Sequence, residues 1–172
     1  TDEFKDFPPF LRQAVSIARR VVNPLSELVH AWHLDTKSGV NDILSLPLHP
    51  LQAEVPPDLV LRQIRRTVVQ LVNDVGVDFN AAVARPWLAT ALQFVCGLGP
   101  RKAAHMVDVV KRSGGVIYNR AELLNLNAVQ PVVYRNCAGF LKIDQSSLVV
   151  DDESSFGTFP LDATRIHPDD YP

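Results

Sequence analysis

The chain has 172 residues, of which 47% are hydrophobic and 21% are charged. This composition excludes global disorder and supplies enough apolar side chains for a folded core. The longest apolar runs are far shorter than the ~20 residues needed to cross a bilayer, so no membrane contact is expected. Two cysteines are too few for a disulfide framework or a four-cysteine metal site, which favours a reducing compartment.

The formal net charge of −2 is unevenly distributed. Residues 86–143 carry seven basic and two acidic side chains, a net charge of +5, whereas residues 144–172 carry one basic and seven acidic side chains, a net charge of −6. A basic segment in an acidic chain predicts an anion-binding surface, although such runs are often only solvated faces. The sequence opens on Thr1 instead of Met, so we expect a fragment of a longer chain.

The first part of the chain predicts three helices, because apolar residues recur there at helical spacing. They cover residues 10–22, 24–32 and 58–75. Asn23 is expected to cap the second helix and Asp58 the third, and Gly76 is expected to stop the third. Residues 35–57 lack the helical pattern and are rich in proline, which indicates a connector with a short strand at residues 43–46.

Shorter helices are predicted in the second part of the chain. They cover residues 79–84, 86–95, 100–113, 120–126 and 131–140. Asp78 is expected to cap the first of them, and Asn119 with Glu122 has the spacing of a capping box. The acidic stretch 145–159 is expected to be a surface loop, and residues 161–166 the start of another element. The sequence is therefore mainly α.

A glycine-rich bend separates two of these helices and is the sharpest local feature. Gly97 and Gly99 can adopt positive φ and leave the backbone uncovered, while Leu98 fills the gap between the helices. Backbone N–H groups at the start of the following helix are suited to bind a phosphate oxygen, and Arg101 and Lys102 add positive charge there. The bend therefore predicts a phosphate contact. A corner whose glycines serve packing alone is the alternative.

Other glycine-rich sites fit the bend less well. A dinucleotide fingerprint needs a third glycine after a strand, but Lys102 stands at that position and the preceding residues look helical. The pattern of a nucleotide-binding P-loop is absent.

The bend resembles a helix-hairpin-helix motif, whose common form is glycine, an apolar residue, glycine, and an alanine four residues later. Residues 97–99 and Ala103 match this form. Glycosylases with lyase activity in this superfamily carry a lysine two residues after the second glycine and an aspartate further on. Arg101 and Asn119 stand at about these positions, so lyase chemistry is not expected.

Six ordered stretches together resemble one family over nearly the whole chain, the suppressor-of-Ty-six elongation factors, which are the eukaryotic relatives of bacterial Tex. The stretches are residues 14–29 (AVSIARRVVNPLSELV), 49–52 (HPLQ), 72–87 (VNDVGVDFNAAVARPW), 92–106 (LQFVCGLGPRKAAHM), 136–144 (NCAGFLKID) and 161–172 (LDATRIHPDDYP). The resemblance implies a mainly α fold: a paired helix-hairpin-helix domain over residues 58–143, the end of an RNase-H-like domain and a connector over residues 1–57, and an acidic loop leading into the following domain over residues 144–172.

The resemblance also implies a function. This family escorts elongating RNA polymerase II in the nucleus, chaperones histones and binds nucleic acid, and catalysis is not expected of this region. We expect non-catalytic binding of the phosphate backbone of DNA or RNA without sequence specificity. The residues expected to carry it are Gly97, Leu98, Gly99, Arg101, Lys102, Lys111, Arg112 and Arg120.

The second hairpin departs from the family pattern. Where the family often has leucine, glycine, proline and lysine, this chain has Val129, Gln130, Pro131 and Val132. Without the glycine and the lysine, we expect the second hairpin to be mainly structural and the first to be the principal contact.

No metal, cofactor or catalytic site is expected. His30 and His33 are three residues apart on a predicted helix, but zinc needs three or four converging ligands and nothing completes the set. The acidic residues 151–153 are expected to be solvated, and the sequence has no nucleophile–base signature. Cys96, beside the bend, is expected to be a small buried thiol.

A scaffold without nucleic-acid contact is the alternative function. In that case the bend only braces neighbouring domains, while Arg62, Arg65 and Arg66 or the acidic tail meet a histone or a polymerase subunit. The two hypotheses differ in whether the bend is open to solvent.

Overall fold

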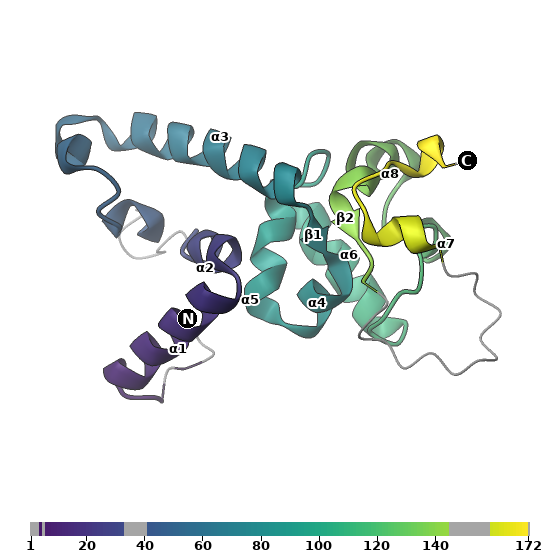
Figure 1. Ribbon diagram of the computed structural model, residues 1–172, viewed down its shortest axis with the longest axis horizontal. Helices are drawn as coiled ribbons and strands as arrows, with labels where there is room; N and C mark the ends of the chain where they lie inside the picture. The colour runs from purple at the N-terminus through teal and green to yellow at the C-terminus, as the bar shows by residue number, and fades with distance from the viewer. Residues whose placement is uncertain (1–3, 5, 33–40, 145–158, 172) are drawn as a thin grey trace.

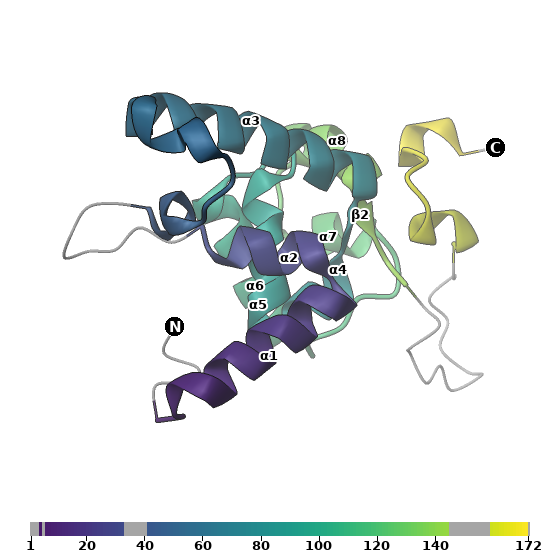
Figure 2. The same cartoon turned by 60° about the vertical axis from the view of Figure 1, so that its left-hand side comes forward.

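The structure, a computed structural model, describes residues 4, 6–32, 41–144 and 159–171. Two helices, α1 (Pro9–Val22) and α2 (Pro24–His30), lie at one end of the molecule with the start of the long helix α3 (Pro57–Val75) (Figures 1 and 2). The side chain of Asn23 accepts a hydrogen bond from the Ser26 amide, which confirms the predicted cap of α2.

The connector between these helices differs from the prediction. The expected strand at residues 43–46 is wrong, because this segment forms the 3-10 helix η2 (Asp42–Ser45), followed by a second one, η3 (Pro50–Glu54). Asn41 caps η2 by accepting the Ile43 amide, a local bond that competes with extended pairing. Asp58 does not cap α3, since the helix begins one residue earlier and Pro56 occupies the cap position.

Gly76 ends α3, as predicted, because the chain must turn sharply there with φ +77. The strand β1 (Val77–Asp78) follows at once and leads into α4 (Phe79–Ala84). The predicted cap of α4 is confirmed, since the Asp78 carboxylate accepts the Ala81 amide at 3.0 Å.

The first hairpin consists of α5 (Pro86–Ala89) continued by the 3-10 helix η4 (Thr90–Phe94), a bend, and α6 (Pro100–Arg112). The second consists of α7 (Glu122–Asn125), a turn, and α8 (Pro131–Cys137), which continues as the 3-10 helix η5 (Ala138–Phe140). The capping box before α7 is confirmed, because Asn119 Oδ1 accepts the Glu122 amide and Glu122 Oε1 accepts the Asn119 amide.

Two short strands join the end of α3 to the second hairpin. β2 (Leu141–Lys142) follows the second hairpin and pairs in parallel with β1, with Val77 opposite Leu141. The end of α3 is thereby fixed against the end of the second hairpin, although about 65 residues separate them in the sequence.

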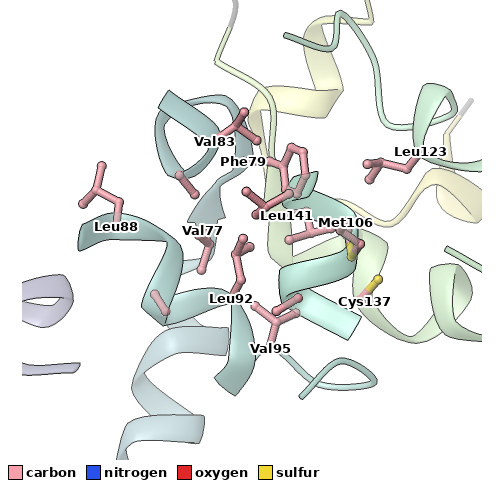
Figure 3. Packing of buried hydrophobic residues seen from close by; sticks show 14 of the residues in the cluster. Val77, Phe79, Val83, Leu88, Leu92, Val95, Met106, Leu123, Cys137 and Leu141 are labelled. Atoms are coloured by element: carbon pink, nitrogen blue, oxygen red, sulfur yellow. The ribbon is translucent and has the colours of Figure 1, made fainter. Parts of the chain in front are cut away.

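The core lies between the two hairpins and the second half of α3 (Figure 3). Phe79, Leu92, Met106, Leu123 and Leu141 are fully buried or nearly so and come from five different elements. Each such side chain contributes about 1.5–3 kcal/mol relative to an exposed one. By contrast, α1 has no buried residue.

The C-terminal residues fold back onto this body. The short helix η6 (Pro160–Ala163) contacts β2, and directly after that strand the Ile143 amide donates to the Asp162 carbonyl at 2.9 Å. The helix η7 (Pro168–Asp170) follows His167, whose ring nitrogen lies 2.9 Å from the Arg135 carbonyl of α8 (Figure 1). The predicted surface loop 145–159 lies outside the described residues apart from its last one.

The predicted fold class is confirmed, since the described chain is mainly helical with two short strands. The RNase-H-like assignment of residues 1–57 and the division into three domains stay predictions. None of the helices in the described part of the chain has the length and apolar character needed to cross a membrane.

Candidate nucleic-acid interface

The bend of the first hairpin requires both of its glycines, for different reasons. Gly97 has φ +84, and a Cβ there would lie 2.8 Å from the Cβ of Asn136 on α8. Gly99 has φ +119, but a Cβ there would meet nothing within 4 Å. Gly97 therefore allows close packing against the second hairpin, whereas the backbone at Gly99 faces open space. Both conformations are unfavourable for other residues.

Along the bend, amides that donate a hydrogen bond within the chain alternate with amides that have no partner among the described residues. The Cys96 amide donates to Asn73 Oδ1 at 2.9 Å, and the Leu98 amide donates to the Val95 carbonyl at 3.1 Å. The amides of Gly97 and Gly99 have no hydrogen-bond partner within the described residues. The first helical bond of α6 comes from Ala103, so its first turn also presents donors that the helix does not use.

Asn73 positions the bend and was not among the predicted site residues. It is 7% exposed. Its Oδ1 accepts a hydrogen bond from the Cys96 amide, and its Nδ2 donates to the Phe94 carbonyl at 3.0 Å. The sequence signal for it is a polar residue among the apolar ones that α3 buries, beside Val72.

Arg101 and Lys102 bring positive charge to the bend, as predicted. Both side chains are exposed on the first turn of α6, and Lys102 Nζ donates to the Gly97 carbonyl at 3.0 Å. This bond fixes the ammonium group on the backbone of the bend. Together with the positive end of the α6 dipole, the two cations favour binding of an anion at the bend.

Lys111 and Arg112 do not join this cluster. Both are exposed in the last turn of α6, ten residues from the cations of the bend, which at helical rise is about 15 Å along the axis. Arg112 Nε donates to the Asp108 carbonyl. At this position the two cations interact favourably with the negative C-terminal end of the helix dipole, and they belong to a different part of the surface.

Arg120 is not a nucleic-acid contact, which corrects the prediction. Its side chain is 1% exposed, and its guanidinium group donates to the carbonyls of Leu141, Ile166 and Thr164 and to the Tyr171 hydroxyl. Its Nε also lies 3.8 Å from an oxygen of Asp162, whose side chain is 3% exposed. Because the C-terminal segment covers Arg120 completely, this cation holds that segment in place and cannot reach a phosphate.

A cavity of about 460 Å³ lies next to the bend, between the start of α6 and the turn of the second hairpin. Its lining combines both cations with residues that the sequence did not indicate, among them His105 and Asn127. Asn127 has φ +53, a left-handed conformation that asparagine tolerates better than most residues. Gln130 has φ −77, so the missing glycine there causes no strain.

The two cysteines have opposite surroundings. Cys96 is exposed, so its expected burial is wrong, while Cys137 is buried and burial raises the pKa of its thiol to about 12. The sequence analysis expects no metal site at His30 and His33, and His33 lies outside the described residues. Within the described residues, no group of three or more His, Cys, Asp or Glu side chains has the arrangement to hold a metal ion.

Comparisons with known proteins agree with this geometry. A family model described as a helix-hairpin-helix motif matches residues 41–144. Among curated proteins, the chain is 38% identical over 169 residues to the Suppressor of Ty 6 homolog of Caenorhabditis elegans, covering 98% of this chain and 11% of the relative. It is 37% identical over 169 residues to the Transcription elongation factor SPT6 of Drosophila melanogaster, covering 98% and 9%. It is 41% identical over 169 residues to the Transcription elongation factor spt6 of Aspergillus fumigatus, covering 96% and 11%.

These matches confirm the resemblance seen in the sequence. The chain spans about a tenth of the length of the curated relatives that it matches.

Proposed function

The chain belongs to the helix-hairpin-helix family and is related along nearly its whole length to transcription elongation factors named Suppressor of Ty 6, and from this premise we propose that it binds the phosphate backbone of nucleic acid without catalysis and without sequence specificity. One observation carries the proposal. The bend of the first hairpin is open to solvent and has two amides, those of Gly97 and Gly99, with no intramolecular partner in the described chain.

The surrounding charges support the same function. Arg101 and Lys102 are exposed beside these amides, and the backbone at Gly99 has open space in front of it for a phosphate group. Contacts to phosphate carry no base information, so unrelated sequences should bind alike. A patch with two cations predicts weak affinity, with a Kd of about 10⁻⁴–10⁻⁶ M at physiological salt.

The experiment compares two double variants that remove the same charge from the same helix. R101A/K102A removes the cations of the bend, and K111A/R112A removes those at the far end of α6. Binding of mixed-sequence duplex and single-stranded DNA is measured by fluorescence anisotropy across a salt series. We expect R101A/K102A to weaken binding about tenfold or more and to lower the salt slope by about 2, since each phosphate contact contributes about 1.

The control should change little at physiological salt, because its two cations lie about 15 Å away along α6. Equal losses for both variants would mean that only overall charge matters, and the bend would not be the site.

We further propose that the segment acts in the nucleus as part of a transcription elongation factor and histone chaperone, with the RNA polymerase II elongation complex and histones as partners. The names of the relatives support the role in elongation. Pull-down of this chain with purified histones and with elongation complexes tests these partners, and a chain that retains neither would contradict the assignment.

A scaffold role without nucleic-acid contact is the second candidate, and one contact favours it. The close approach of Gly97 to Asn136 explains that glycine by packing alone. If R101A/K102A left nucleic-acid binding unchanged while the chain remained folded, the bend would serve only to brace the two hairpins.

A further inference from the structure

The cavity beside the bend has the mixed lining of a ligand site. Its apolar part consists of Ala128 and Val129, which are buried, and Val133, which is partly buried. Its polar rim carries the cations of α6 and the side chains of His105, Asn127 and Gln130. Its volume of about 460 Å³ lies within the range of about 300–1,000 Å³ that small-molecule pockets occupy and is far more than a phosphate group fills.

Two side-chain amides at this rim are available to a ligand. Asn127 and Gln130 are exposed, and their side chains have no hydrogen-bond partner in the described part of the chain. A primary amide offers both donors and an acceptor, which is the pattern found on the edges of nucleobases. The apolar residues of the same lining suit the face of a planar ring.

The cavity and the bend share residues, so one ligand can occupy both. Arg101 and Lys102 belong to the cavity lining and also flank the bend. The carbonyl of Val133 lies 3.5 Å from where a Cβ of Gly97 would be, so the wall of the cavity at Val133 adjoins the bend. A strand with a phosphate at the bend therefore has an adjacent nucleotide at the cavity.

We propose that the cavity receives one unpaired nucleobase of the strand whose phosphate binds at the bend, an inference that rests on the proposed function. The ring packs on Val129 and Val133, and the amides of Asn127 and Gln130 meet its edge. The bases of a duplex are paired and stacked, so a duplex offers only its phosphates. The site thus prefers single strands to duplexes.

The experiment uses the full 172-residue chain and three DNA probes of equal length. The first is a mixed-sequence single strand, the second the same strand with abasic sites at its central positions, and the third the corresponding duplex. Fluorescence anisotropy gives each Kd at one salt concentration. We expect the intact single strand to bind about fivefold more tightly than the abasic strand, because only the former fills the cavity.

Two neighbouring valines of α8 provide matched variants. V133A removes part of the cavity floor, and V132A removes the same groups from a side chain that is 75% exposed and does not line the cavity. V133A should weaken binding of the intact single strand about threefold to fivefold and leave the abasic strand unchanged, while V132A should change neither. Q130A, whose side chain is exposed, repeats the test without disturbing the fold if V133A lowers the melting temperature.

The outcomes separate the two proposals. If the abasic strand binds as tightly as the intact one, or if V133A and Q130A weaken all three probes equally, the cavity does not hold a base. The phosphate site at the bend would remain, provided that R101A/K102A still weakens every probe. If R101A/K102A weakens none, the phosphate site fails first and the cavity proposal fails with it.

Discussion

The two hairpins of this chain use similar helices and turns but differ in how many turn amides lack a partner in the described chain and in the exposure of the nearby cations. At the first bend, the amides of Gly97 and Gly99 have no partner in the described chain, and the side chains of Arg101 and Lys102 are exposed. At the second turn, the amides of Ala128 and Val129 both donate to the Leu123 carbonyl, and the Gln130 amide is the one in residues 127–130 without a partner. Before the second hairpin, Arg120 turns inward.

The difference shows that positive charge near a hairpin does not by itself make a binding surface. Arg120 has the same charge as Arg101, but it is covered by residues 159–171 and is surrounded by backbone carbonyls. This arrangement supports the prediction that the first hairpin is the principal phosphate contact. That the second hairpin is mainly structural stays a prediction, because its turn also lines the cavity.

Substitution of Arg120 tests the role of the buried cation and has the largest expected effect on stability. R120A leaves the Asp162 carboxylate buried without its cation, which should lower the free energy of unfolding by about 3–5 kcal/mol. Denaturant unfolding measures this loss. At temperatures where the variant remains folded, its affinity for DNA should stay within about twofold of the wild type, because Arg120 does not reach a ligand.

The matched control is R135A, because Arg135 also pairs with an aspartate of the C-terminal segment, Asp169. Those side chains are 80% and 64% exposed, so the loss should be below about 1 kcal/mol. A similar loss for both variants would show that burial does not distinguish the two pairs.

Substitution of the two glycines tests the packing of the first bend on the second hairpin. G99A should lower the free energy of unfolding by about 1–3 kcal/mol, because alanine is strained at φ +119 although space is available for its methyl group. G97A should cost more, since its methyl group would also overlap Asn136. Thermal and denaturant unfolding of the two variants test this order, and an equal or reversed order would contradict the close packing of the bend on α8.

Asp78 is the last residue of β1 and directly precedes α4, and its substitution is expected to have a small effect. Burial raises the pKa of its carboxyl above the ordinary value of 3.8; the Ala81 hydrogen bond lowers this pKa, and the charge of Asp144 raises it. D78N keeps a good cap but removes the charge, so it should be more stable than wild type at pH 7. D78A loses the cap and should cost about 1 kcal/mol.

The pH dependence of D78N follows from the direction of this shift. The folded protein binds the proton of Asp78 at higher pH than the unfolded chain does, so the wild type gains stability relative to D78N as pH falls through the raised pKa. The advantage of D78N should therefore disappear below about pH 3.8, the unfolded value. Melting temperatures at pH 3 and pH 7 measure it, and an advantage that grows at low pH would contradict the raised pKa.

Sequence patterns predicted most helices because their signals are local. Asn23, Asp78 and the pair Asn119 and Glu122 cap the helices they were expected to cap, since a cap joins atoms only two or three residues apart. The expected strand at residues 43–46 failed for a related reason. Its apolar residues carry no strong period, and the neighbouring Asn41 favours a turn.

The candidate site was predicted in part. The bend and its two cations are contiguous in the sequence, so their proximity needed no tertiary information. Asn73, Asn127 and Gln130 reach the same place from other elements, and single-sequence patterns do not report which elements meet.

The sequence by itself determined the approximate positions of most helices, the identity of the glycine-rich bend and the sign of its charge, because capping, apolar period and glycine conformation act over a few residues. Only the tertiary structure decided that Arg120 faces inward and that a cavity opens beside the bend. Exposure depends on which distant segments pack together. Here residues 159–171 bury Arg120, and the second hairpin forms one wall of the cavity.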